Sequence, residues 1–160
     1  MSTPVAVVVA DTTPIISLAG VGEIRLLPLL FGEIHIPEQV WGEYEKFRPQ
    51  QQLPDLSTLT WLHRHQVSVS PQFTILDDGE AAALTLVQML QARLLLVDEQ
   101  KARKVATRAK IQIVGTLGLL LRAKQEGRIT AIRPITDQFL RRKRYYTPTL
   151  IAQVLQAAGE

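Results

Sequence analysis

Residues 5–20 read VAVVVADTTPIISLAG and place a carboxylate at the end of an apolar run. The run over residues 4–10 is typical of a strand that is buried on both faces. After it, Thr13 is suited to cap a helix, and Pro14 fits the first turn of that helix. A charge at the tip of a buried strand is costly without a compensating partner, so Asp11 needs an explanation.

A second apolar strand repeats this arrangement. Residues 93–99 read RLLLVDE, and Asp98 follows the apolar residues as Asp11 does. Ligands of open parallel sheets bind outside the carboxyl ends of the strands, so we expect both aspartates at one edge. Two neighbouring carboxylates repel each other unless a cation lies between them. Mg²⁺ or Mn²⁺ would relieve this repulsion, because both ions prefer carboxylate oxygen.

The alternation of strand and helix patterns predicts an α/β protein, a three-layer α/β/α sandwich around a mostly parallel sheet. We expect one domain that covers residues 1–160. The expected strands are 4–10, 33–37, the end of 59–69, 93–99 and 111–115. The expected helices are 15–21, 23–31, 37–47, 77–90, 100–110, 116–127, a short one after 129–135, and 147–159, with a loop at 48–58.

The composition is that of an ordinary globular protein, with 46% hydrophobic and 21% charged residues in a chain of 160. The chain has no cysteine, which excludes disulfides and thiolate metal sites. No basic region precedes the first apolar run, and the later stretch VGTLGLLL is too short to span a bilayer. We therefore expect a cytoplasmic protein.

Charge is unevenly distributed along the chain. Residues 1–100 contain 5 Lys/Arg and 12 Asp/Glu, a net charge of −7, whereas residues 101–160 contain 13 Lys/Arg and 3 Asp/Glu, a net charge of +10. An acidic half beside a basic half indicates a carboxylate site next to a surface for a polyanion. The alternative is that both halves are solvated surface.

The expected helix 100–110 carries the first group of candidate RNA-binding residues. Lys101, Lys104 and Arg108 share one face, which is suited to following a phosphate backbone. Arg103 points elsewhere, toward the acidic residues. 

A basic run before the last helix is the second group. It precedes Tyr145 and Tyr146, and such a combination can hold single-stranded RNA by phosphate contact and base stacking. A solvated tail or a protein contact is the alternative. The basic residues are Arg141, Arg142, Lys143 and Arg144.

Glu43 and Glu80 are candidates for the same acidic cluster. Glu43 lies on the helix after HIP, and Glu80 lies at the start of the helix that DDG opens. Each has a simpler explanation: Glu43 as an exposed helix acid, and Glu80 as a favourable charge at a helix N-terminus. Asp11 and Asp98 could likewise cap the helices that follow them.

Two small hydroxyls lie at expected strand-to-helix turns. Thr13 and Thr116 could each donate a hydrogen bond to a ligating carboxylate, or could simply cap a helix. Thr116 follows Gly115, where the backbone can approach a ligand closely. His63 and His65 fall in a weakly patterned segment, and we expect them to be surface or structural residues.

Five segments together resemble the PIN-domain family, the fold of VapC-type toxin ribonucleases, and especially a compact prokaryotic subfamily. The resemblance covers nearly the whole chain. Position by position, Asp11 matches the family's first strand-end aspartate, and Asp98 matches the later one. Glu43 matches the glutamate after the IP..V segment, and Glu80 matches the third acidic position, which many relatives fill with Asp. The matching segments are VVADTTPIISL, IHIPEQVWGEY, LDDGEAAALTL, LLLVDEQKARKVA and IVGTLGLLLRAKQEGRI.

The resemblance implies a Mg²⁺- or Mn²⁺-dependent ribonuclease in which one or two ions bind the acidic cluster and activate a water that attacks phosphorus. Asp11 and Asp98 would be direct ligands. Glu43 and Glu80 would ligate through water or orient the nucleophile. The resemblance also implies the toxin of a toxin–antitoxin pair, a homodimer and neutralisation by a small antitoxin.

Two other functions fit parts of the sequence. An RNA-binding or antitoxin-binding module would keep the fold and the basic surface without turnover. A phosphoryl-receiving regulator would need a lysine at the end of a strand, and no strand clearly presents one. RNA turnover separates the first of these from a nuclease, whereas metal binding does not.

Overall fold

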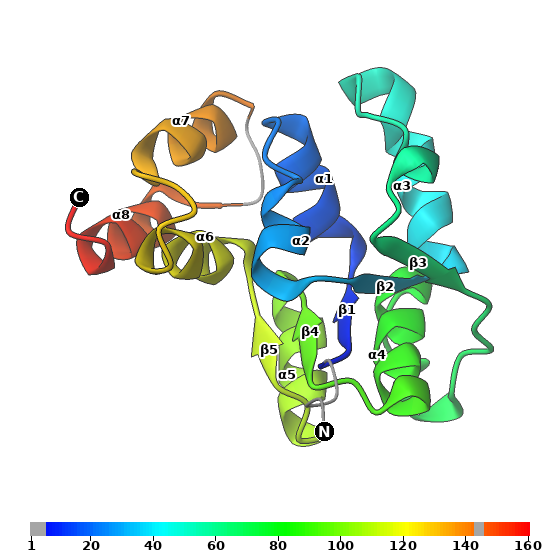
Figure 1. The fold of residues 1–160 in the computed structure, drawn as a ribbon. Helices are drawn as coiled ribbons and strands as arrows, with labels where there is room; N and C mark the ends of the chain where they lie inside the picture. The colour runs from blue at the N-terminus through cyan, green and yellow to red at the C-terminus, as the bar shows by residue number, and fades with distance from the viewer. Residues whose placement is uncertain (1–5, 143–145) are drawn as a thin grey trace, which may run out of the picture.

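The computed structural model describes residues 6–142 and 146–160. Within them the strands are β1 (Val8–Ala10), β2 (Ile34–Pro37), β3 (Leu62–His65), β4 (Leu94–Leu96) and β5 (Ile113–Val114). The α-helices are α1 (Thr12–Gly20), α2 (Leu26–Phe31), α3 (Glu38–Gln51), α4 (Asp78–Leu90), α5 (Gln100–Arg108), α6 (Thr116–Gln125), α7 (Arg133–Arg141) and α8 (Pro148–Ala157). Short 3-10 helices are η1 (Leu56–Thr58) and η2 (Pro71–Phe73). Figure 1 shows their arrangement.

The described strands form one parallel sheet in the order β3-β2-β1-β4-β5. Val9 pairs with His35 of β2 on one side, and Ala10 pairs with Leu96 of β4 on the other. The chain first builds outward from β1 through β2 to β3, then returns to add β4 and β5 beyond β1. The order therefore reverses between β1 and β4, and such a switch point opens a crevice at the carboxyl ends of the strands.

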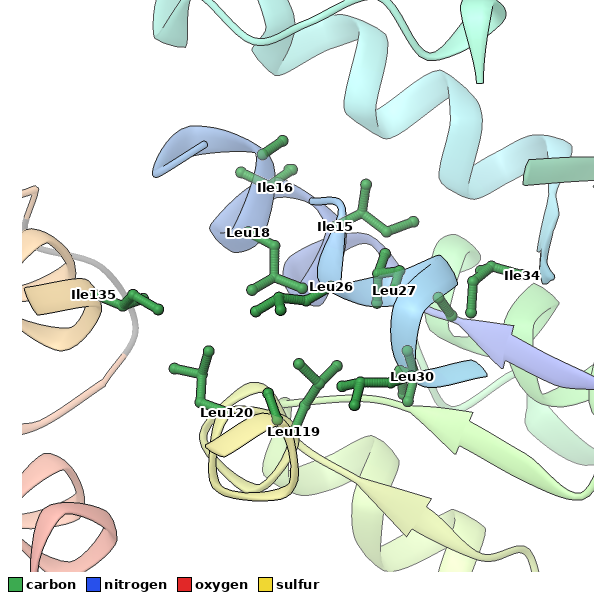
Figure 2. Close-up of a cluster of buried hydrophobic side chains, with 14 of the residues drawn as sticks. Ile15, Ile16, Leu18, Leu26, Leu27, Leu30, Ile34, Leu119, Leu120 and Ile135 are labelled. Carbon is green, nitrogen blue, oxygen red and sulfur yellow. The ribbon is translucent and has the colours of Figure 1, made fainter. Parts of the chain in front are cut away.

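Two apolar clusters cover the two faces of the sheet. One joins the sheet to α1, α2, α3 and the C-terminal helices, and the other joins it to α4 and α5. In Figure 2, Ile15 of α1, Leu26 of α2 and Leu119 of α6 converge on the first cluster. The three-layer α/β/α fold predicted from the alternating pattern is confirmed.

The apolar segment 23–31 is mainly core. Leu26, Leu27 and Leu30 are buried, whereas Leu29 is 40% exposed. This segment therefore offers little apolar surface for an interface. In the described residues, no helix is long and apolar enough to cross a membrane.

Several element boundaries differ from the prediction, and three of these differences have a structural reason. α3 continues through Pro49 to Gln51, where we expected a loop, and the segment after it is held by the buried Leu53 and by the hydrogen bond from the Tyr44 hydroxyl to the Pro54 carbonyl. β3 occupies the middle of 59–69 rather than its end, because the register with β2 pairs Ile34 with Leu62. Thr13 lies inside α1 and does not cap it, since Asp11 occupies the capping position.

The histidines lie together at the β2–β3 edge. His35 Nδ1 is 2.9 Å from His65 Nε2, and the His35 ring stacks on that of His63 with centroids 5.1 Å apart. Burial and the neighbouring imidazoles lower the pKa values of His35 and His65. These mutually packed rings suit the structural role expected for His63 and His65.

Candidate active site at the strand-order switch

Asp11 lies at the switch point, directly after β1, and is only 4% exposed. It precedes α1, yet its side chain accepts no capping hydrogen bond, so helix capping does not account for it. Burial raises the pKa of Asp11 to about 7, with the backbone N–H of Thr12 opposing this and the carboxylates of Glu43, Asp77 and Asp98 adding to it. A cation beside this carboxylate would offset the cost of its charge.

Glu43 projects from α3 toward Asp11. Its Oε2 accepts a hydrogen bond from the Thr12 hydroxyl. Its carboxylate also lies against Gly79 at the start of α4, where an added Cβ would be 2.7 Å from Glu43 Cδ. Burial raises the pKa of Glu43. Glu43 is thus held by two other elements and is not a free surface acid.

Glu80 enters the cluster from the first turn of α4. Asp77 Oδ1 caps this helix by accepting the backbone N–H of Glu80 at 2.8 Å. Glu80 Oε2 is buried without a hydrogen-bond partner. Burial, the contact with Asp77 and the charge of Asp11 raise the pKa of Glu80 to about 9. A favourable helix-end position explains the residue type, but not the unpartnered oxygen.

Asp98 follows β4 and is held by hydrogen bonds to both carboxylate oxygens. Oδ1 accepts the backbone N–H of Thr116 at 2.7 Å, and Oδ2 accepts the Thr116 hydroxyl at 2.7 Å. Oδ2 also accepts the Tyr146 hydroxyl at 2.6 Å, and that hydroxyl lies 3.0 Å from Ser17 Oγ. The residue that caps α5 is Glu99, so Asp98 is free of the capping role.

The four predicted carboxylates come from four different segments and lie near one another at the switch point, where the charges of Glu43 and Asp98 act on Asp11 and that of Asp11 acts on Glu80. In the part of the chain that the structure describes, no group of three His, Asp or Glu side chains already surrounds a point for an ion. The donor set nevertheless fits a hard divalent cation, because it offers only carboxylate oxygen, one atom of it buried and unpartnered. Asp11, Glu43, Glu80 and Asp98 are the residues that could hold such an ion.

Of the two predicted hydroxyls, the structure places only Thr116 against a carboxylate. Thr12, which the sequence analysis did not single out, makes the contact expected of Thr13. Thr13 instead lines a cavity of about 680 Å³ beside Asp98. The alternation of strand and helix could not separate the two threonines, since the choice depends on where the helix begins.

Arg103 reaches the acidic site, as expected. Its Nη1 donates to the carbonyl of Val97 at 3.3 Å. At Gly115, an added Cβ would lie 2.6 Å from this Nη1 and 3.0 Å from Asp98 Oδ1. Glycine at this position therefore allows Arg103 to lie beside the carboxylate.

The other basic residues that were predicted to bind RNA lie in several places. Lys104 and Arg108 line a shallow groove together with Arg103, whereas Lys101 Nζ donates to the carbonyl of Ile75 at 3.0 Å. Arg141 and Arg142 are exposed at the end of α7. Lys143, Arg144 and Tyr145 lie outside the described residues.

Tyr146 corrects a sequence expectation. It is 7% exposed, and its ring packs on Phe139 with centroids 4.9 Å apart, so it is not an open platform for base stacking. Burial, followed by the charge of Asp98, raises its pKa, which keeps the hydroxyl a proton donor. Only the tertiary packing of the C-terminal helices brings it to Asp98, 48 residues away in sequence.

Comparison with known proteins identifies the family of this chain. A family model described as a PIN domain (DUF3368) matches residues 7–160. The chain therefore belongs to the PIN-domain family, whose members are generally nucleases that use divalent metal ions. A search of curated proteins found no match.

Proposed function

We propose that this protein is a Mg²⁺- or Mn²⁺-dependent endoribonuclease that hydrolyses phosphodiester bonds of single-stranded or structured RNA. The observation that carries the proposal is the convergence of Asp11, Glu43, Glu80 and Asp98 from separate segments on one switch point. Buried carboxylates cost stability, and here they repel one another as well. A protein retains such a cluster where a bound cation and a reaction need it.

Each side chain has a part in the proposed reaction. Asp11 and Asp98 would hold the cation directly, with Asp98 oriented by Thr116 and Tyr146. Glu43 and Glu80 would bind through water or orient the attacking water. A divalent cation bound there would lower the pKa of that water and neutralise charge on the phosphate. 

The biological role that we propose is the toxin of a toxin–antitoxin pair. This role, a homodimer, a small antitoxin partner and a cytoplasmic location are what the family resemblance implies. The basic groove of Arg103, Lys104 and Arg108 is compatible with RNA as the substrate.

One observation favours a second candidate, a catalytically weak RNA-binding or antitoxin-binding module. Both oxygens of Asp98 already accept hydrogen bonds, from Thr116 and Tyr146. If these bonds occupy the lone pairs that a cation needs, the site would keep the fold and lose turnover. 

Cleavage of a mixed set of labelled single-stranded RNAs in Mn²⁺, Mg²⁺ or EDTA tests the proposal. Wild type should cut with either metal, EDTA should stop the reaction, and Asp98→Asn should reduce the rate at least about 100-fold. Asp137→Asn is the matched control, because Asp137 is an exposed aspartate on α7 outside the site. Absence of cutting by folded wild type that binds Mn²⁺ would favour the binding module. Cutting that survives EDTA and Asp98→Asn would contradict the proposed site.

A further inference from the structure

The cavity beside Asp98 is not used by the reaction described above. It measures about 680 Å³, within the roughly 300–1,000 Å³ range of ligand pockets. Its walls come from the start of α5, the end of β5, α6 and α8. Ile113, Leu117, Leu150 and Val154 supply apolar wall, and Gln153 adds an amide.

A second groove continues from this cavity along α5. The two share Gln100, Arg103 and Ile113, and the groove adds Lys104 and Arg108. Among residues 6–142 and 146–160, no acidic side chain lines this groove, whereas Asp98 and Glu99 line the cavity. The carboxylate site, a partly apolar hollow and a cationic groove therefore lie next to one another.

Gly118 keeps one wall of the cavity open. It lies within α6, where glycine is less favourable than alanine. An added Cβ would meet only Val114 Cγ2, at 3.4 Å, which is an ordinary contact. The helix backbone and its packing therefore do not require a glycine here. A glycine does leave more space in the cavity than any other residue would.

We propose that this cavity binds one unpaired base of a single-stranded RNA while the cationic groove carries the adjoining phosphates. The inference rests on the proposed ribonuclease function and narrows its substrate to unpaired segments. A base in a duplex is stacked and paired, and it cannot enter a hollow between helices without leaving the stack. Apolar walls accept the flat faces of a base, and the Gln153 amide can donate and accept hydrogen bonds at its edge.

The position of the cavity favours a nucleotide as its occupant. Asp98 lines the cavity, so a base bound there belongs to a nucleotide next to the one whose phosphate meets the carboxylates. Arg103 borders both depressions and can neutralise the phosphate between them. An acidic peptide would use the same cations, and the test below separates it from RNA.

Binding measured in EDTA tests the inference without requiring cleavage. Fluorescence anisotropy would compare wild type, Gly118→Ala and Gly118→Leu on a labelled single-stranded RNA and on its duplex form. We expect wild type to prefer the single strand, with affinity reduced slightly by alanine and roughly tenfold by leucine, whose side chain fills the hollow. Gly42→Leu is the matched control: Gly42 is an exposed α3 glycine with nothing within 4 Å of an added Cβ. Thermal unfolding of each variant checks folding.

An abasic scan of the same RNA locates the base. In wild type, one abasic position should weaken binding roughly tenfold, and Gly118→Leu should remove this position effect because its hollow is already filled. Equal binding by wild type and Gly118→Leu, or no sensitive abasic position, would overturn the inference and leave the cavity to a protein partner. The ribonuclease proposal would survive that result if wild type still cuts RNA with metal. Failure to cut or bind any RNA would overturn both.

Discussion

The role of Tyr146 at the candidate site depends on its hydroxyl group. Its hydroxyl donates to Asp98 Oδ2 at 2.6 Å and lies 3.0 Å from Ser17 Oγ. A donor behind a ligating carboxylate fixes its orientation and tunes the ligand. The Tyr146 hydroxyl therefore fixes the orientation of the Asp98 carboxylate, and in the proposed reaction Tyr146 is a positioning residue.

Tyr146→Phe should weaken Mn²⁺ binding by about tenfold while the ring still packs on Phe139. Isothermal titration calorimetry with Mn²⁺ measures this. Tyr44→Phe is the control, because the Tyr44 hydroxyl donates to the carbonyl of Pro54 at 2.7 Å, away from the carboxylates. It should lower the free energy of unfolding by about 1 kcal/mol and leave Mn²⁺ affinity unchanged. Equal Mn²⁺ affinity in Tyr146→Phe and wild type would rule out the positioning role.

Asp11→Asn should stabilise the metal-free protein at pH 8. The folded pKa of about 7 exceeds the ordinary 3.8, so the folded state loses stability relative to the unfolded state as pH rises from about 3.8 to about 7. The neutral amide avoids this loss, which is about 4 kcal/mol at pH 8 and less at pH 5, at about 1.4 kcal/mol for each unit of pKa difference. Urea unfolding in EDTA at both pH values measures the difference.

The same substitution should abolish stabilisation by Mn²⁺, because it removes a ligand charge. Asp137→Asn should leave both the pH dependence and the Mn²⁺ effect as in wild type. A pH-independent destabilisation by Asp11→Asn would show that the carboxylate is held by ordinary hydrogen bonds instead.

At the scale of elements, the approach of α3 to α4 shapes the site. Glu43 on α3 lies against the backbone of Gly79 on α4, and Thr12 at the start of α1 donates to the same carboxylate. These three helices meet where the strands end. Their contact explains why Glu43 faces inward although α3 carries polar residues around much of its circumference.

Gly79→Ala should displace the Glu43 carboxylate, because the new methyl would lie 2.7 Å from Cδ. We expect RNA cleavage to fall by about tenfold or more, since misplacement by about 1 Å has large effects on catalysis. Cleavage rates at saturating Mn²⁺ measure this. Gly42→Ala adds the same methyl to open space on α3 and should not change the rate. Full activity of Gly79→Ala would mean that Glu43 adjusts freely and that its position is unimportant.

At the scale of the whole molecule, the C-terminal helices are tied to one another and to the site. The Glu160 carboxylate accepts the backbone N–H groups of Ile132 and Arg133 at 2.7 and 3.0 Å, and it pairs with Lys124 at 3.0 Å. This carboxylate thus joins α6, the start of α7 and the segment after α8. Tyr146 lies between α7 and α8, and its hydrogen bond to Asp98 connects these helices to the candidate site.

Glu160→Gln should lower the free energy of unfolding by about 1 kcal/mol at pH 6. The hydrogen bond from the backbone N–H of Ile132 is the largest of the effects that lower the pKa of Glu160 from 4.5 to about 2. Its stabilisation is therefore present above pH 4.5 and is lost as pH falls toward 2. Urea unfolding of wild type and variant should differ at pH 6 and converge near pH 2. Glu126→Gln removes only an exposed pair with Arg122 and should have little effect at either pH. A Glu160→Gln effect that persists unchanged at low pH would contradict this assignment.

The sequence by itself determined the α/β class, nearly all elements and the carboxylates at the strand ends. These features depend on local patterns: apolar runs, helix periodicity, and the residue that follows each strand. The predicted boundaries of the elements were wrong where long-range strand pairing or helix packing decided them. Examples are the β2–β3 register and the continuation of α3 through Pro49.

Only the tertiary structure decided which hydroxyls serve the carboxylates. Thr12 replaced Thr13 because Asp11 rather than Thr13 holds the capping position, so α1 begins two residues earlier than the sequence indicated, and that changes which side chain faces α3. Tyr146 contacts Asp98, and the Glu43 carboxylate lies against Gly79, because segments far apart in the chain pack together. Local sequence preferences carry no information about such contacts, since these depend on how the helices pack across the end of the sheet.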